Sequence, residues 1–121
     1  YQKEAIDLLD KVVANHWYTY KTYDNLVILN EKLGNYTQVS KYLSYMKKTY
    51  GDDYNINKRY AFLEIDLQKE KSNEERDYES FYKYYKEAKK LYEKEEKNDS
   101  EMQLLDDVYR QVEEGGWLDN V

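Results

Sequence analysis

The sequence predicts an all-α fold, an antiparallel helix-hairpin solenoid with a C-terminal capping helix. Two segments that begin at residues 5 and 39 share one apolar pattern at a spacing of 34 residues. In each segment, small or aliphatic residues at i, i+4 and i+7 mark one face of a helix. The 121 residues include no proline and only four glycines, so few positions interrupt long helices. Sixteen tyrosines, each with an apolar body and a polar tip, suit a thin helical layer that is half exposed on both faces.

The first two predicted helices follow from the apolar period and from capping residues. The first covers residues 1–15 and ends at Asn15 and His16, which are poor helix formers. Thr19 or Thr22 is a suitable cap for the second, because a hydroxyl oxygen accepts a hydrogen bond from a free amide of the first turn. The second helix then runs to about residue 33.

A glycine turn separates the second helix from the third. Gly34-Asn35 predicts a stop between two antiparallel helices, because glycine adopts a positive φ without strain. The third helix covers about residues 36–50 and ends at Gly51. The predicted apolar positions of the first three helices are Ala5, Leu8, Leu9, Val12, Val13, Tyr23, Leu26, Val27, Leu29, Leu33, Val39, Tyr42, Leu43 and Met46.

The period lengthens in the second half of the chain. The fourth predicted helix spans about residues 54–71, and a polar insertion follows it. The motif at residues 35–39 recurs 42 rather than 34 residues later, so eight extra residues extend the fourth helix and its loop. The fifth helix begins at Glu75 or Tyr78 and ends at about residue 97.

A last helix is predicted over about residues 101–114. Ser100 lies three residues before Gln103, as in a capping box, and Gly115-Gly116 ends the helix. Trp117-Leu118 then folds back as the apolar partner of a glycine C-cap. The predicted apolar positions of the last three helices are Tyr60, Ala61, Leu63, Ile65, Leu67, Phe81, Tyr85, Ala88, Leu91, Leu104, Leu105, Val108 and Val112.

The period of 34 carries a resemblance to a repeat family. Residues 20–53 combine a large aromatic at Tyr23, the turn Gly34-Asn35-Tyr36, and apolar residues at Val39 and Leu43. With this pattern the chain resembles tetratricopeptide repeat (TPR) proteins, whose units cannot bury their apolar faces alone and therefore stack. The resemblance implies a single domain over residues 1–121, made of a half-unit (1–17), a repeat (20–53), a longer repeat (54–97) and a capping helix (100–114).

Three short stretches carry a narrower resemblance: residues 59–64 (RYAFLE), 76–78 (RDY) and 115–118 (GGWL). They are similar to repeat modules at the C-terminus of some Firmicute eukaryotic-like serine/threonine protein kinases, in which a kinase domain precedes the repeats. This resemblance implies a regulatory or sensor domain of a bacterial kinase, although no kinase catalytic motif is present in the sequence. Because the chain opens with Tyr1 inside a helical pattern, we interpret it as part of a larger protein, in an unassigned compartment.

Composition and motifs argue against several classes of function. A net charge of −6 disfavours nucleic acid as a partner, and no apolar run approaches the length of a membrane span. One histidine (His16) and no cysteine disfavour a zinc site or a nucleophilic triad. The paired acids at 52–53, 106–107 and 113–114 lack an EF-hand pattern, so we interpret them as solvated helix ends. We therefore predict a chain that is not an enzyme and has no metal or cofactor.

The remaining hypothesis is a groove for a protein or peptide. In TPR proteins the first helix of each unit lines a concave groove, which assigns Lys21, Asn25, Ile28, Lys58, Arg59 and Phe62 to a peptide-binding surface. Asn25 and Arg59 fall where carboxylate-clamp members of the family hold a peptide's C-terminal carboxylate, a task suited to an amide and a guanidinium fork. A generic peptide groove, a clamp, and a spacer or self-association surface are the three alternatives.

One tyrosine-rich stretch allows two interpretations. Tyr78, Phe81, Tyr82 and Tyr85 share one helical face, which is most simply core. Tyr84 lies outside that face and is a candidate for an exposed contact, since aromatic residues are enriched at interfaces.

Overall fold

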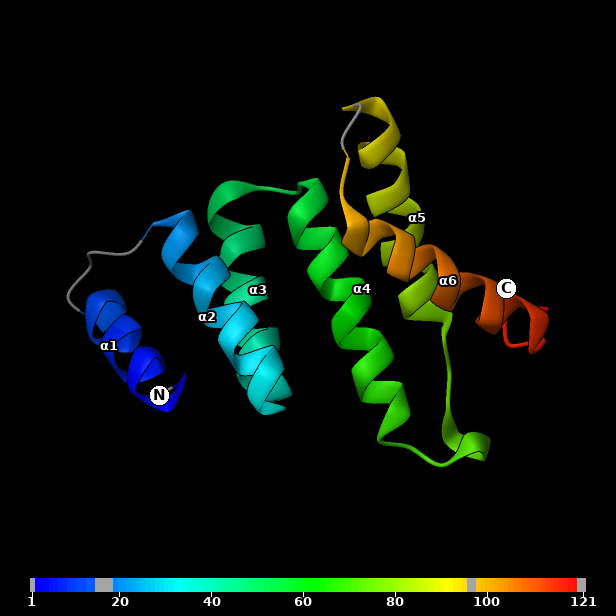
Figure 1. Cartoon of the computed structure of the whole chain (residues 1–121), viewed down its shortest axis with the longest axis horizontal. Helices are drawn as coiled ribbons and strands as arrows, with labels where there is room; N and C mark the ends of the chain where they lie inside the picture. Colours follow the sequence, from blue (N-terminus) through cyan, green and yellow to red (C-terminus); the bar gives the residue numbers. More distant parts are fainter. Residues whose placement is uncertain (1, 15–18, 96–97, 120–121) are drawn as a thin grey trace. The chain divides into compact units, whose positions relative to one another are not determined.

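The computed structural model describes residues 2–14, 19–95 and 98–119, and all regular structure in those ranges is helical (Figure 1). The elements are α1 (Gln2–Ala14), α2 (Tyr20–Leu33), α3 (Tyr36–Tyr50), α4 (Tyr54–Lys69), a 3₁₀ turn η1 (Asn73–Glu75), α5 (Glu79–Lys94) and α6 (Ser100–Glu114). Helices α2 and α3 form one antiparallel hairpin, and α4 and α5 form another (Figure 1). The predicted all-α class of antiparallel helix hairpins is confirmed.

The chain divides into two compact units, Tyr1–Gly51 and Asp52–Val121. The division falls close to residue 54, the predicted start of the longer repeat. The first unit contains α1, α2 and α3, and the second contains α4, η1, α5 and α6.

Gly34 sets the turn of the first hairpin. Its φ is 73°, in the left-handed region that a side chain would strain, so the predicted positive φ is confirmed. The Gly34 amide donates to the carbonyls of Asn30 and Glu31, and the Asn35 amide donates to the Asn30 carbonyl at 2.9 Å. These bonds satisfy the last carbonyls of α2 and reverse the chain within two residues.

The core of the first unit consists of the apolar stripes of α2 and α3. Its buried apolar residues are Tyr23, Leu26, Val27, Val39, Tyr42, Leu43 and Met46. Leu8 and Leu33 are predicted apolar positions, but their side chains are 64% and 42% exposed. Leu33 is the last residue of α2, next to the turn at Gly34. The side chains of Leu9, Val12 and Val13, and the whole of Asn15 and His16, lie outside the described residues.

Side-chain caps start α2 and α4. Thr19 is the cap of α2, as predicted, and its hydroxyl and that of Thr22 each accept the other residue's backbone amide at 3.3 Å. Asp53 caps α4 by accepting the amide of Ile56 at 2.7 Å. Each cap satisfies an amide that has no partner within its helix.

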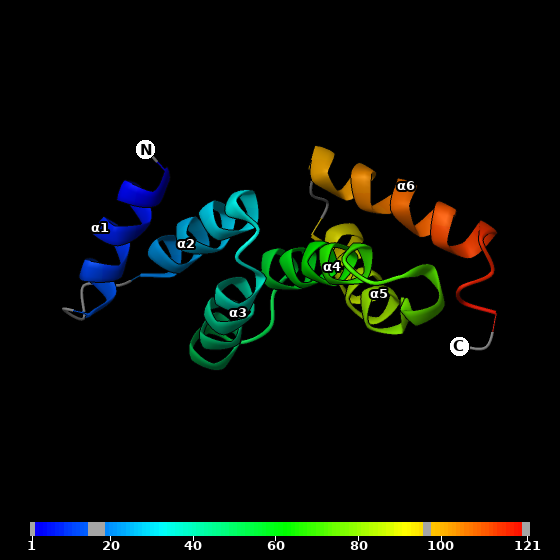
Figure 2. The same ribbon diagram turned by 90° about the horizontal axis from the view of Figure 1, so that it is seen from below.

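The second unit is an α4–α5 hairpin with α6 lying against it (Figure 2). Small residues at Ala61 and Ala88 are fully buried and permit close helix packing around Phe81. Tyr84 is half-buried and stacks on Tyr60 of α4 with a centroid distance of 4.6 Å, so this candidate contact is partly used within the unit. The buried residues of this core are Tyr54, Ala61, Ile65, Tyr78, Phe81, Tyr85, Ala88, Met102, Leu105 and Val112.

Two details of α6 differ from the prediction. The cap is Asp99 rather than Ser100, because the Asp99 carboxylate accepts the amide of Glu101 at 3.1 Å and Ser100 is already helical. Leu104, predicted to be buried, is 57% exposed, whereas Leu105 is fully buried. Adjacent helical residues point about 100° apart, and the side of α6 that packs against the hairpin contains Leu105 and not Leu104. Met102, which the apolar pattern missed, is buried instead.

Arg76 holds the polar insertion after α4 in place through hydrogen bonds. Its guanidinium donates to the carbonyls of Gln68, Lys69 and Lys71 at 2.9, 3.3 and 3.1 Å. The side chain of Gln68, which is buried, accepts the amide of Asp77 at 2.8 Å. These contacts satisfy the carbonyls at the end of α4, where no glycine cap is present, and lead the chain into α5.

We predict that α6 contributes much of the stability of the second unit through Leu105. Leu105→Ala should lower the free energy of unfolding by about 2–4 kcal/mol, because it leaves a cavity in a packed core. Leu104→Ala is the matched control and should cost less than about 0.5 kcal/mol, since that side chain is mostly in solvent. Urea unfolding followed by circular dichroism measures both variants, and equal losses would contradict the packing of α6.

Candidate functional site

The six predicted groove residues divide between the two units. Lys21, Asn25 and Ile28 lie on α2, spaced by four and three residues, so they share one side of that helix. Lys21 is exposed, while Asn25 and Ile28 are half-buried. The side of α2 that carries these residues is distinct from its buried stripe of Tyr23, Leu26, Val27 and Asn30.

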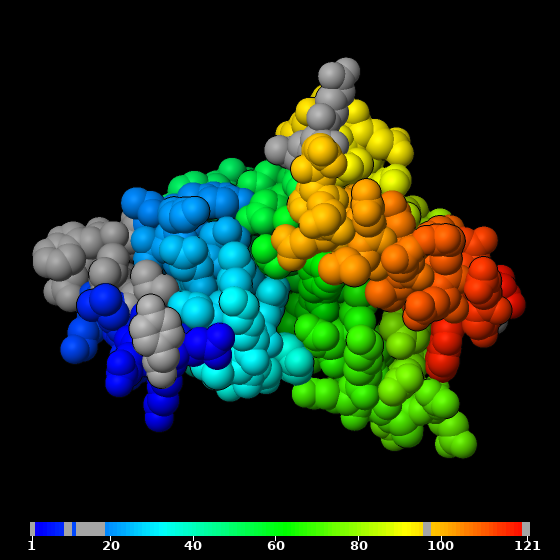
Figure 3. Space-filling model, viewed as in Figure 1, coloured from blue at the N-terminus to red at the C-terminus, as the bar shows by residue number. Residues whose placement is uncertain are grey.

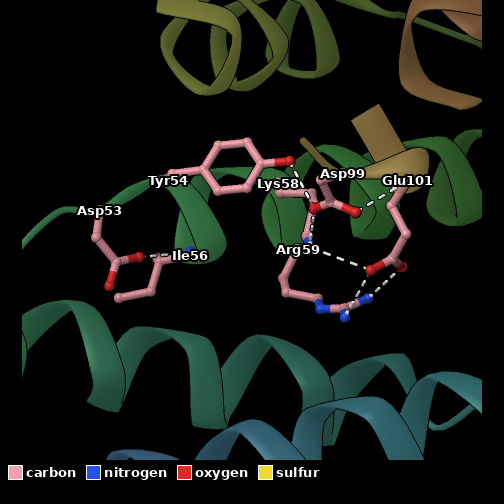
Figure 4. A network of polar contacts seen from close by, with 7 residues as sticks. All are labelled: Asp53, Tyr54, Ile56, Lys58, Arg59, Asp99 and Glu101. Carbon is pink, nitrogen blue, oxygen red and sulfur yellow. Dashed lines mark hydrogen bonds and ion pairs between the residues drawn. The ribbon is translucent and has the colours of Figure 1, made fainter. Parts of the chain in front are cut away.

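The α4 residues have partners inside the second unit. Lys58 lies 2.8 Å from an oxygen of Asp99 and 3.1 Å from an oxygen of Glu101 (Figure 4). Arg59 binds Glu101 with both terminal nitrogens, at 3.0 and 3.2 Å. Only 6% of Lys58 and 8% of Arg59 is exposed. Phe62 is half-buried and packs against the core of this unit.

Asp99 is the centre of this polar network. Its carboxylate accepts hydrogen bonds from the Tyr54 hydroxyl at 2.7 Å, the Lys58 ammonium at 2.8 Å and the Glu101 amide at 3.1 Å (Figure 4). The same group therefore caps α6 and attaches it to α4. Asp99 and Glu101 also lie at the N-terminal end of α6, where the helix dipole favours negative charge.

The network perturbs the pKa values of its members. Desolvation by itself would raise the pKa of Asp99, but the bonds from Lys58, Tyr54 and the Glu101 amide outweigh it and lower that pKa to about 2. Burial, reinforced by the hydrogen bond to Asp99, raises the pKa of the Tyr54 hydroxyl. Asp99 is therefore ionised and Tyr54 is neutral at physiological pH.

A second polar cluster joins α5 to α6. The Tyr85 hydroxyl donates to Asp106 at 2.6 Å, and Lys89 forms an ion pair with the same carboxylate at 3.0 Å. Burial, with the bond to Asp106, raises the pKa of Tyr85. Both clusters therefore attach α6 to the α4–α5 hairpin through acids of α6.

These contacts bear directly on the carboxylate-clamp hypothesis. Arg59 is the residue assigned there to a partner's carboxylate, and its terminal nitrogens already bind the carboxylate of Glu101. Lys58, the other groove cation of α4, is likewise bound to Asp99 and Glu101. On α4 an acidic segment of this chain occupies the basic groups, whereas Lys21 of α2 is exposed.

Sequence reasoning missed Asp99 and Glu101 as the partners of these cations. They lie 41 to 43 residues away along the chain, on a helix whose packing no local pattern defines. Two adjacent cations next to the predicted apolar positions of α4 are a signal that such partners exist, because buried charges require compensation.

The described residues assemble no metal centre. Within residues 2–14, 19–95 and 98–119, no group of three or more His, Asp or Glu side chains is placed to hold a metal ion. In the same ranges, no helix has both the length and the apolar character needed to cross a bilayer. His16, the one histidine, lies outside them.

We predict an acid-sensitive step in stability that depends on Asp99. The folded-state pKa of about 2 is below the ordinary value of 3.8, so this group stabilises the fold above about pH 4, and the effect is lost as pH falls toward 2. Asp99→Asn retains a capping oxygen but removes the charge, and should cost about 1–2 kcal/mol at pH 7 after allowance for solvent screening.

The measurement is urea unfolding at several pH values between 2 and 7. The difference between wild type and Asp99→Asn should shrink as pH falls from 4 to 2. Asp107→Asn is the matched control, since its ion pair with Arg110 is solvent-exposed and should contribute little. A constant difference across this range would contradict the role of the ionised carboxylate.

Comparison with known proteins finds no family model, no curated protein and no solved structure that matches this chain.

Proposed function

We propose that this chain is a non-catalytic module that binds a protein or peptide partner, as an interaction or scaffolding part of a larger bacterial protein. The observation that carries the proposal is the side of α2 opposite its buried stripe, where an exposed lysine, a half-buried amide and a half-buried aliphatic side chain share one helical face at Lys21, Asn25 and Ile28. Polar groups beside an apolar anchor are typical of peptide-binding surfaces.

Exposed apolar side chains in both units support the same proposal. Tyr45 is 51% exposed on α3, and Leu104 is 57% exposed on α6. Figure 3 shows α6, in orange, at the surface of its unit. Tyrosine in particular is enriched at protein interfaces, because its rigid ring supplies contact area and its hydroxyl supplies a hydrogen bond.

The alternative is a regulatory domain of a serine/threonine kinase, with TPR-like repeats after a catalytic domain. It is favoured by the resemblance at residues 76–78 and 115–118. Two of these residues have a visible part in the fold. Arg76 binds three backbone carbonyls, and Gly116 has a φ of 80° that allows the chain to fold back. These residues therefore build the fold of the second unit, and an upstream kinase domain in the complete reading frame is the test of this alternative.

We predict that peptide binding maps to α2. The probe is an array of 15-residue acidic peptides, each with a free or an amidated C-terminus, titrated with the full chain. Lys21→Ala and Ile28→Ala should each raise the Kd of the tightest peptide by about fivefold to tenfold, as expected for one interface contact. Loss of binding on amidation would identify a carboxylate clamp.

Lys48→Ala is the control for the loss of a positive charge, since Lys48 is an exposed lysine on α3 of the same unit. It should leave the Kd unchanged. Equal weakening by Lys21→Ala and Lys48→Ala would indicate general charge attraction and would contradict a site on α2, as would an absence of binding by wild type.

A further inference from the structure

A hollow of about 260 Å³ lies between α5, α6 and the segment after α6. It is lined by Tyr82, Tyr109, Glu113, Leu118 and Asp119. All five residues belong to the second unit. Figure 3 shows α6 and the following segment, in orange and red, at the molecular surface. None of these residues belongs to the predicted groove or to the network around Asp99.

The C-terminal fold-back forms one side of the hollow. Gly116 has a φ of 80°, and the amide of Trp117 donates to the carbonyl of Val112 at 3.2 Å. The indole of Trp117 then packs edge-on against Tyr78 with a centroid distance of 5.3 Å. Leu118 packs against the core, and Asp119 follows it at the rim. The predicted fold-back of Trp117-Leu118 onto α6 is thereby confirmed.

Tyrosine rings form the opposite wall. Tyr82 stacks on Tyr109 with an interplanar angle of 12° and a centroid distance of 5.7 Å, and Tyr109 stacks on Tyr85 at 4.7 Å. The ammonium of Lys86 lies 4.4 Å from the centroid of Tyr82. A positive group of the chain itself is thus already bound by this aromatic wall, as expected for a cation–π contact.

The acids of α6 differ in how their charges are balanced. Asp99 and Glu101 bind Lys58 and Arg59, Asp106 binds Lys89, and Asp107 binds Arg110. In contrast, neither Glu113 nor Asp119 forms an ion pair with any of the residues that the structure describes. The two acids that line the hollow therefore carry uncompensated negative charge.

The position of Glu113 in the last turn of α6 makes its charge unfavourable. The last turn of α6 has no basic residue and includes Glu113 and Glu114. The C-terminal end of a helix carries partial negative charge, so carboxylates there are repelled and a cation is favoured. The hydroxyl of Tyr109 is hydrogen-bonded to Glu113, and this bond is the main cause that raises the pKa of Tyr109 to about 12.

We propose that this hollow binds a basic side chain, arginine or lysine, of a protein partner. The aliphatic stem lies against Leu118 and the tyrosine rings, and the charged head group binds Glu113 and Asp119. This arrangement supplies the positive charge that the end of α6 lacks. The inference rests on the proposed function in requiring a protein partner, but it concerns the second unit and not α2.

The test uses the full chain and a blocked tripeptide, acetyl-Gly-Arg-Gly-amide, followed by NMR of the protein's backbone amides. The expected result is saturable binding with shifts centred on Glu113, Leu118 and Asp119. Glu113→Gln and Asp119→Asn should each raise the Kd about threefold to tenfold, the effect of one partly exposed charge contact. The norleucine analogue, with the stem but no charge, should bind at least tenfold more weakly.

The matched control is Glu114→Gln. It makes the same change of charge one residue away, at an exposed position that does not line the hollow, and should leave the Kd within twofold of wild type. Equal effects of Glu113→Gln and Glu114→Gln, an equally tight norleucine peptide, or no saturable binding would each overturn the proposal. Lys21→Ala should not change this binding, so the α2 site and the hollow can fail independently.

Discussion

The second unit depends on the ion pairs between two buried cations of α4 and two acids at the start of α6. Lys58 and Arg59 are almost fully buried, and a charge without a partner at such depth would cost several kcal/mol. Asp99 and Glu101 supply the compensating charges. Asp99 also caps α6, and Glu101 lies in the first turn of that helix. The position of α6 is therefore fixed electrostatically at one end, while Met102, Leu105 and Val112 fix it by packing.

This constraint determines which surfaces can take a partner. The cations of α4 are paired with the chain's own carboxylates, so a ligand acid that used them would have to displace the start of α6 against these ion pairs. A ligand that bound the exposed lysine of α2, or the acidic hollow at the end of α6, would not have to displace these ion pairs. The two candidate surfaces have opposite charge and belong to different units, so they select ligands of different chemistry.

Local patterns were sufficient for the helices and insufficient for the ion pairs. The apolar period and Gly34 predicted the ends of α2 and α3, because packing stripes and a left-handed turn depend on residues that are close together in the sequence. The same period could not choose between Leu104 and Leu105, since that choice depends on how α6 is rotated against α4 and α5. It also could not choose Asp99 over Ser100 as the cap, because Tyr54 and Lys58 stabilise Asp99 from another helix. The helices that carry the predicted groove residues were identified correctly. The partners of Lys58 and Arg59 could be identified only from the tertiary structure.

The two ends of α6 show how one helix can serve both stability and recognition. At its start, acids agree with the helix dipole, with the cap and with neighbouring cations, so every level of structure favours the same arrangement. At its end, Glu113 opposes the dipole and has no ion-pair partner among the described residues, and Asp119 adds to the same negative surface. A sequence selected for stability alone would place a lysine or arginine in that last turn. The unfavourable charge is instead retained beside a tyrosine-walled hollow, which is the arrangement expected where the compensating cation comes from another molecule.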